Sequence, residues 1–163
     1  KVAISSAALQ NPELISQIAK AIGKQSVVGV LDCKKNFFGN YSVFIHNAKQ
    51  KLKIDFLSAL QLFEAAGVGE IMINSIDNDG VMNGYDVRLA NLAHDSVNVP
   101  LTILGGAGSK HDLYSLIDKF RIIGAAAGSL FVFKGEYKAV LISYLNDEEK
   151  TLVQKMAVMQ GEL

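Results

Sequence analysis

Short apolar runs alternate with longer stretches of helical periodicity along the chain. Apolar residues without a polar alternation are typical of parallel strands that are covered on both faces. Five such runs are predicted strands, at residues 2–4, 26–31, 70–75, 100–104 and 122–127. This alternation predicts right-handed βαβ units and a parallel sheet.

The stretches between these runs repeat apolar residues every three or four positions, as amphipathic helices do. We predict that the first helix has Pro12 at its first position and ends at Gly23. Residues 41–46 are expected to form an exposed strand, residues 136–144 a helix, and the residues after 146 either a helix or a frayed end. Predicted N-cap residues are Asn11, Asp55, Asp86 and Ser109.

Small or polar residues follow every predicted strand, and their distribution bears on the architecture. A doubly wound sheet concentrates its ligand at one switch point, whereas a (β/α)8 barrel gathers functional residues from all its strand ends. The pattern therefore favours an α/β fold of the barrel type, with the barrel part at residues 1–145 and a tail or extra helix at 146–163. The residues concerned are Ser5-Ser6, Asp32, Asn74-Ser75, Gly105-Gly106 and Gly128-Ser129.

Composition excludes several classes of function. Half of the 163 residues are hydrophobic, and 16 basic residues balance 16 acidic ones, so neither a nucleic acid nor a membrane is expected as a partner. The single cysteine, Cys33, excludes an intrachain disulfide, and the three histidines lack metal-ligand spacing. We expect no metal and no cofactor. No apolar run is long enough to span a membrane, and the first residues lack a signal-peptide pattern, so a cytoplasmic protein is expected.

Two glycine-rich turns, at residues 105–108 and 127–129, follow consecutive predicted strands. Glycine permits close backbone approach, and backbone N–H groups at a helix start bind phosphate. The pair favours a phosphate site over two tight turns with no ligand. Ser5-Ser6 predicts either a second anion site or simple helix capping.

Two carboxylates are candidates for acid–base chemistry. Asp32 ends an apolar strand, where a charge is costly unless it is paired or used. Asp79 follows the strand at 70–75, although an Asx-type turn before Gly80 also explains it. Carboxylates that face one cavity divide acid and base roles when their environments differ.

The segments VLDCKK, SIDNDGVMNGYD, LGGAGS and AAAGSLF, together with SSAALQNPELI near the start, resemble the cyclase subunit of imidazole glycerol phosphate synthase. The resemblance runs from residue 1 to about residue 133. It implies a (β/α)8 barrel, of which this chain supplies strands four to eight. It also implies a glutaminase subunit that delivers ammonia, and a small-molecule substrate with a phosphate at each end. The reaction yields imidazole glycerol phosphate and the purine intermediate AICAR.

The resemblance assigns roles to individual residues. Asp32 matches a catalytic aspartate, and we count Asp79 as a second catalytic candidate. Lys1 and Glu70 match the ammonia gate and glutaminase-docking end of the barrel. The residues implied for phosphate and substrate binding are Ser5 and Ser6 at one phosphate, Asp79, Gly80, Gly106, Gly128 and Ser129 at the other, and in addition Asn74.

Three positions depart from the family pattern. Ser5 stands where asparagine is usual, Asn74 replaces a threonine, and Leu104 replaces a small residue. The segment VFKGEYKAVLISY resembles a paralogous branch linked to surface-polysaccharide genes, in which ammonia builds an amidino group on a sugar. This paralogue is the alternative function.

Five βα units are fewer than the eight, in about 250 residues, of a complete barrel. The family's other catalytic aspartate, on its first strand, has no counterpart in this sequence. We therefore expect two open sheet edges, a chain that pairs with another copy or forms part of a larger protein, and little activity of the chain alone. A non-catalytic module is a further alternative.

Overall fold

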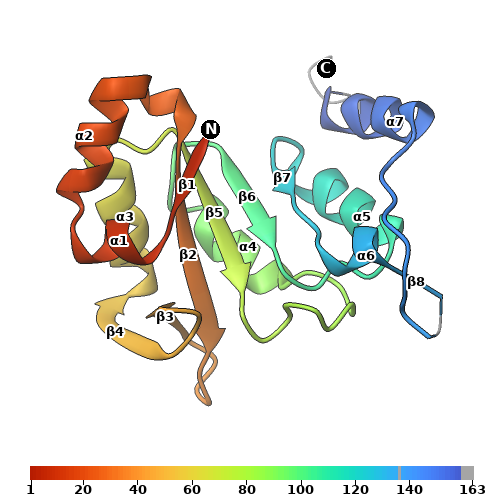
Figure 1. Ribbon diagram of the computed structural model, residues 1–163, viewed down its shortest axis with the longest axis horizontal. Helices are drawn as coiled ribbons and strands as arrows, with labels where there is room; N and C mark the ends of the chain where they lie inside the picture. The colour runs from red at the N-terminus through yellow and green to blue at the C-terminus, as the bar shows by residue number, and fades with distance from the viewer. Residues whose placement is uncertain (136, 159–163) are drawn as a thin grey trace.

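The computed structural model describes residues 1–135 and 137–158. Five parallel strands are neighbours in chain order (Figure 1): β1 (Val2–Ile4), β2 (Val27–Lys35), β5 (Glu70–Ser75), β6 (Leu101–Leu104) and β7 (Gly124–Ala125). Each crossover therefore advances the sheet by one strand in the same direction. A doubly wound sheet reverses direction at its switch point, so the order confirms the α/β, barrel-type prediction. Within the described residues β1 and β7 do not pair, and the sheet is open.

A hairpin of β3 (Tyr41–Ile45) and β4 (Gln50–Asp55) extends the sheet beside β2. β3 runs antiparallel to the second half of β2, whereas β1 pairs with its first half. The strand expected at 41–46 is confirmed, but its predicted exposure is wrong. Val43 and Ile45 are fully buried, because α3 (Phe56–Ala66) packs against β3. β4 was not predicted.

The predicted helix starts are confirmed at three of four positions. Asp55, Asp86 and Ser109 accept backbone N–H bonds at the starts of α3, α4 (Val87–His94) and α5 (Lys110–Phe120). The N-cap predicted at Asn11 is wrong. A short helix, α1 (Ser6–Gln10), ends at Asn11, and α2 (Glu13–Ile22) begins after Pro12 without a side-chain cap bond. Gly23 ends α2 with a φ of 85°, as predicted.

Two of the five parallel strands differ from the prediction at both ends. The strand expected at 26–31 begins at Val27, because residues 24–26 form a 3-10 turn, and it continues to Lys35, where β3 pairs with it. The strand expected at 122–127 is reduced to β7, and Ile122 is largely exposed.

The helix predicted at 136–144 is wrong for the described part of that range. After α6 (Ser129–Val132) the chain forms a hairpin of β8 (Phe133–Lys134) and β9 (Ala139–Val140). Gly135 and Lys138 have positive φ values of 74° and 48°, which reverse the chain. The returning segment then runs beside α6, since Leu141 N and Ser143 N donate to carbonyls of that helix and its end. Residue 136 lies outside the described residues.

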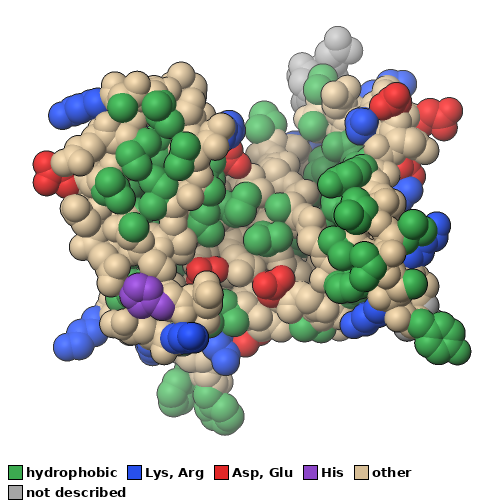
Figure 2. Space-filling model, viewed as in Figure 1, with side chains coloured by type: hydrophobic (Ala, Val, Ile, Leu, Met, Phe, Trp, Pro, Cys, Tyr) green, Lys and Arg blue, Asp and Glu red, His purple; other side chains and the backbone are tan. Residues whose placement is uncertain are grey.

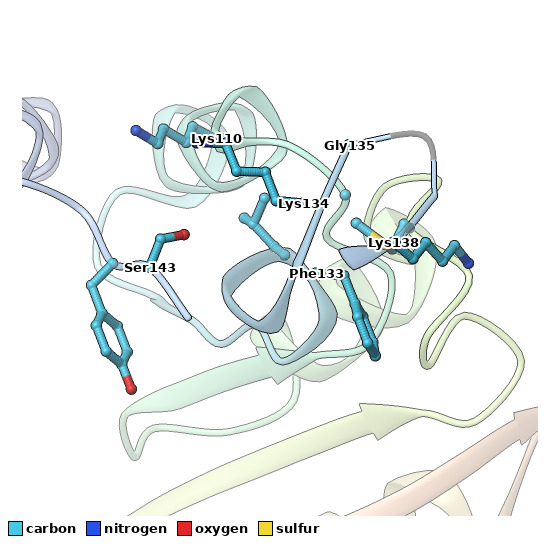
Figure 3. Close-up of a pocket in the computed structure, with 10 residues that line it drawn as sticks. Lys110, Phe133, Lys134, Gly135, Lys138 and Ser143 are labelled. Carbon is cyan, nitrogen blue, oxygen red and sulfur yellow. The ribbon is translucent and has the colours of Figure 1, made fainter. Parts of the chain in front are cut away.

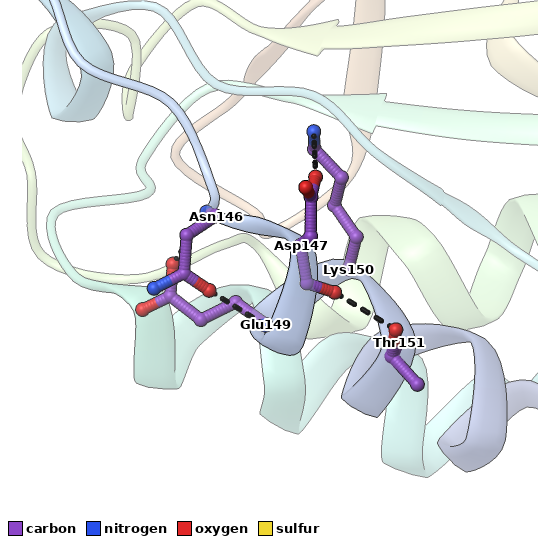
Figure 4. A network of polar contacts seen from close by, with 5 residues as sticks. All are labelled: Asn146, Asp147, Glu149, Lys150 and Thr151. Carbon is purple, nitrogen blue, oxygen red and sulfur yellow. Dashed lines mark hydrogen bonds and ion pairs between the residues drawn. The ribbon is translucent and has the colours of Figure 1, made fainter.

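The final described helix, α7 (Asp147–Val158), shows that residues 147–158 are helical. Asn146 and Glu149 exchange two hydrogen bonds of 2.9 Å at its start (Figure 4). Lys110 of α5 pairs with Glu149, and Arg121 at the end of α5 donates to Met156 O at 3.1 Å. These contacts hold α7 along α5. Residues 159–163 lie outside the described residues, and the boundary at 145 stays a prediction.

The core lies between the sheet and its outer helices. Leu31, Ile73 and Ile103 point outward from three strands and are fully buried. Gly29 makes room for Phe63 of α3, whose ring would lie 2.5 Å from a Cβ at that position. In Figure 1, α4 passes behind β5 and β6. The opposite, inner face is hollowed, and apolar side chains gather there above acidic ones (Figure 2).

Candidate functional site

A row of side chains crosses the carboxyl ends of the strands on the inner face. The register places Asp32 of β2 beside Asn74 of β5, and Asn74 beside Leu104 of β6. Ser5, directly after β1, reaches the same carboxylate from the other side. Its Oγ donates to Asp32 Oδ2 at 3.3 Å, and Asn74 Nδ2 donates to Asp32 Oδ1 at 3.0 Å. The three positions at which the sequence is expected to depart from the family pattern therefore all lie in the row that contains Asp32.

Both predicted catalytic carboxylates border one cavity of about 300 Å³. Asp32 is half-buried, whereas Asp79 is exposed in the turn after β5, where its N–H donates to Ser75 O at 2.9 Å. The two aspartates therefore have different environments, as a division of acid and base roles requires. The lining residues are Asp32, Asn47, Ala48, Asn74, Ile76 and Asp79.

Asn47 and Ala48 were missed because they lie in the turn between β3 and β4, and the sequence did not predict that hairpin. Ser6 fixes this turn, since its Oγ accepts a 2.9 Å hydrogen bond from His46 N. Ser5 thus contacts a residue that lines the cavity, whereas Ser6 contacts the turn that borders it, so the two serines have different partners.

The glycine turns also lie at the carboxyl ends of the strands. Gly106 has a φ of 110°, and a Cβ there would lie 2.0 Å from Gly84 O. Gly84 N donates to Gly106 O at 2.8 Å, which ties the loop at 76–86 to the end of β6. Tyr85 donates to Ala126 O at 2.9 Å and ties the same loop to the chain after β7.

Gly80, Gly128 and Ser129 come together across these loops. A Cβ on Gly80 would lie 3.9 Å from Ser129 Oγ, and a Cβ on Gly128 would have no heavy atom within 4 Å. The start of α5 is different, because Asp112 already accepts the N–H groups of Gly108 and Ser109 at 2.9 and 2.8 Å. The start of α6 therefore offers more room for a phosphate than the start of α5.

A second polar cluster lies at the opposite, amino end of the strands. Lys1 Nζ and Glu70 Oε2 are 2.5 Å apart, and Thr102 donates to Glu70 Oε1 at 2.6 Å. Burial alone raises the pKa of Glu70, but the bonds from Lys1 and Thr102 and the charge of Lys1 outweigh it, so the pKa lies below its ordinary value. Thr102 was missed because its role depends on the register between β5 and β6.

A separate cavity of about 480 Å³ lies between the α5 start and the β8–β9 hairpin (Figure 3). Three lysines line it, but the amino groups of Lys110 and Lys138 point away from each other. Lys110 is also paired with Glu149. Lys110 and Lys138 therefore do not converge on one anion.

Metal-binding clusters and membrane-spanning helices are both absent from residues 1–135 and 137–158. Within them no group of three or more His, Cys, Asp and Glu side chains is placed to hold a metal ion. No helix among these residues is both long enough and apolar enough to cross a membrane.

Comparison with known proteins agrees with this geometry. The family described as "histidine biosynthesis protein" matches residues 1–138. A Vibrio vulnificus protein, provisionally named imidazole glycerol phosphate synthase subunit hisF3, is 47% identical over 92% of the chain and 58% of its own length. A Pseudomonas aeruginosa protein, provisionally named subunit hisF2, is 49% identical over 88% of the chain and 57% of its own length. Subunit HisF of Natranaerobius thermophilus is 38% identical over 91% and 59%.

The chain spans less than three fifths of the length of these relatives. The residues that the family matches include the row around Asp32, the glycine turns and the Lys1–Glu70 pair, since the match begins at residue 1 and runs past β7. The chain belongs to the histidine biosynthesis protein family of TIM barrels, within which it is similar to the HisF subunits of imidazole glycerol phosphate synthase.

Proposed function

We propose that the chain carries the acid–base and phosphate-binding part of an ammonia-using cyclase site of the imidazole glycerol phosphate synthase type. The observation that supports this most directly is that Asp32 and Asp79 border one cavity. This cavity lies at the carboxyl ends of the strands, where the glycine turns also lie. A cytoplasmic enzyme without a metal or cofactor fits this chemistry.

In this proposal the substrate is a ribulosyl aminoimidazole-carboxamide nucleotide with a phosphate at each end. Ammonia adds to its ribulosyl carbonyl carbon, which requires that nitrogen lose a proton and oxygen gain one. Asp32 accepts and returns that proton, and Asp79 assists at the other side of the cavity. Gly80, Gly128 and Ser129 seat one phosphate, and Ser6 contacts the other.

The cluster of Lys1, Glu70 and Thr102 lies at the other end of the strands, where we place ammonia entry and the glutaminase partner.

Glu70→Gln would weaken the pairing with Lys1. We expect this variant to lose glutamine-dependent turnover while turnover with added ammonia falls much less. Equal losses in the two assays would contradict a gating role, and thermal unfolding of the variant controls for misfolding.

Ammonia-dependent turnover at high pH, assayed with the full-length native protein, tests the proposed function. Asp32→Asn removes the proton acceptor and is expected to lower kcat by about 100- to 10,000-fold. Asp95→Asn, at a highly exposed carboxylate, is the matched control and should leave kcat unchanged. Full turnover by Asp32→Asn would exclude Asp32 from the mechanism.

A second candidate is amidination of a sugar with ammonia. It is favoured by the position of Ser5, Asn74 and Leu104 in the row that contains Asp32, while the glycine turns keep the family pattern. Ammonia-dependent turnover of a nucleotide sugar, with none of the bisphosphorylated nucleotide, would select this candidate over the first.

A further inference from the structure

We infer that Ser5 and Asn74 are positioning residues, which hold the carboxylate of Asp32 from its two sides and do not bind substrate phosphate. The inference rests on the proposed role of Asp32, and it reassigns two residues that the sequence resemblance places in substrate binding.

The donors come from strands on either side of β2. Ser5 follows β1 and donates to Oδ2, and Asn74 on β5 donates to Oδ1. The terminal torsion of an aspartate is broad, so a single bond restrains it weakly. Two donors that lie on opposite sides of β2 fix the plane of the carboxylate. Each oxygen keeps further lone pairs with which it can accept a proton.

The hydrogen bonds of Ser5 argue against a phosphate role. A serine hydroxyl has one proton, and Ser5 gives it to Asp32 Oδ2. With its proton directed at Asp32, the Ser5 hydroxyl would offer a phosphate oxygen only lone pairs, which repel that oxygen. The carboxylate of Asp32 beside them would also repel the anion. Ser6 differs, because its Oγ accepts from His46 N and that bond does not use its proton. The neighbouring serines therefore have separate functions.

Asn74 is oriented by Asp32 and by nothing else among the described residues. Its Nδ2 donates to Asp32, whereas its Oδ1 is buried without a hydrogen-bond partner within that part of the chain. Leu104, the next side chain in the row, has no donor to offer it. Reversing the Asn74 amide would bring its Oδ1 against Asp32 Oδ1. The carboxylate therefore selects the amide orientation that leaves Asn74 Oδ1 without a partner among the described residues.

Steady-state kinetics with added ammonia separate positioning from substrate binding. Ser5→Ala and Asn74→Ala misplace the reactive carboxylate, so each should lower kcat by about 10- to 100-fold and change KM by less than about twofold. Ser5→Thr keeps the hydroxyl and should restore kcat. Ser6→Ala is the matched control at a neighbouring hydroxyl, and it should raise KM more than it lowers kcat. Asn74→Leu, which keeps the side-chain volume, replaces Asn74→Ala if that variant does not fold.

The Asp32→Asn variant shows which hypothesis has failed. If it retains turnover, the proposed function is wrong. If it loses turnover but Ser5→Ala and Asn74→Ala raise KM at unchanged kcat, or change neither constant, the proposed function stands and the positioning role is overturned. Loss of kcat in both variants with KM preserved, and rescue by Ser5→Thr, would support the positioning role.

Discussion

His46, Asn47 and Ala48 show how single residues shape the site. All three have left-handed backbone conformations, with φ values of 55°, 56° and 63°, and Asn47 and Ala48 line the Asp32 cavity. Each non-glycine residue in this region costs about 1–2 kcal/mol. Such strain persists only where surrounding contacts maintain it, and the bond from His46 N to Ser6 is one of them.

Ala48→Gly removes the steric part of this strain, although glycine also makes the unfolded chain more flexible. We expect the free energy of unfolding to stay the same or to rise by up to about 1 kcal/mol. Ala65→Gly, on an exposed position of α3, is the matched control and should lose about 1 kcal/mol. Urea unfolding measures both variants, and an equal loss in the two would show that Ala48 is unstrained.

Two glycines of the predicted phosphate site should respond differently to alanine. Gly106→Ala places a Cβ against Gly84 O and requires a strained φ, so the protein should lose several kcal/mol of stability. Gly128→Ala meets no neighbouring atom and should change stability by less than about 0.5 kcal/mol. If Gly128 borders the phosphate, inorganic phosphate should bind this variant more weakly. Unchanged affinity, measured by calorimetry, would remove Gly128 from the site.

At the scale of elements, α5 is fixed at its first turn by reciprocal bonds between Ser109 and Asp112. Burial raises the pKa of Asp112, but the N–H groups of Gly108 and Ser109 and the Ser109 hydroxyl outweigh it, so the pKa lies below the ordinary 3.8. A lowered carboxylate pKa means that the ionised side chain stabilises the fold. That contribution is complete above the unfolded pKa and is lost as the pH falls through the folded value.

Asp112→Ala should therefore cost about 1 kcal/mol at neutral pH, and the difference from the unaltered protein should shrink below about pH 4. Asp118→Ala, on an exposed carboxylate of the same helix, should cost less. Chemical denaturation at several pH values measures both. A difference that stays constant down to pH 2 would contradict a role for the ionised carboxylate.

Local chemistry explains which elements could be predicted. Asp55, Asp86 and Ser109 act on the turn that follows them, so their capping roles follow from the sequence. The hairpins β3–β4 and β8–β9 depend on pairing with β2 and on the contacts of α6, which short-range patterns do not contain. Asp32 was identifiable as a charge on an apolar strand, whereas the bonds that Asn74 and Thr102 make depend on strand register.

At the scale of the whole molecule, the sheet presents two unpaired parallel edges within the described residues, at β1 and β7. Its inner face leaves Met72 and Leu104 only half-buried. We propose that further βα units complete the barrel, from the same polypeptide or from a second copy. Light scattering of this chain at micromolar concentration should show a dimer or larger species, and a stable monomer would contradict pairing between copies.

The position of a bound ligand tests the central claim, that the aspartates and the glycine turns form one active site. We would determine the crystal structure of the full-length protein with imidazole glycerol phosphate. The account predicts the phosphate beside Gly80, Gly128 and Ser129, with the imidazole ring in the cavity next to Asp32. A phosphate bound elsewhere, or a ring outside hydrogen-bonding distance of the Asp32 carboxylate, would contradict it.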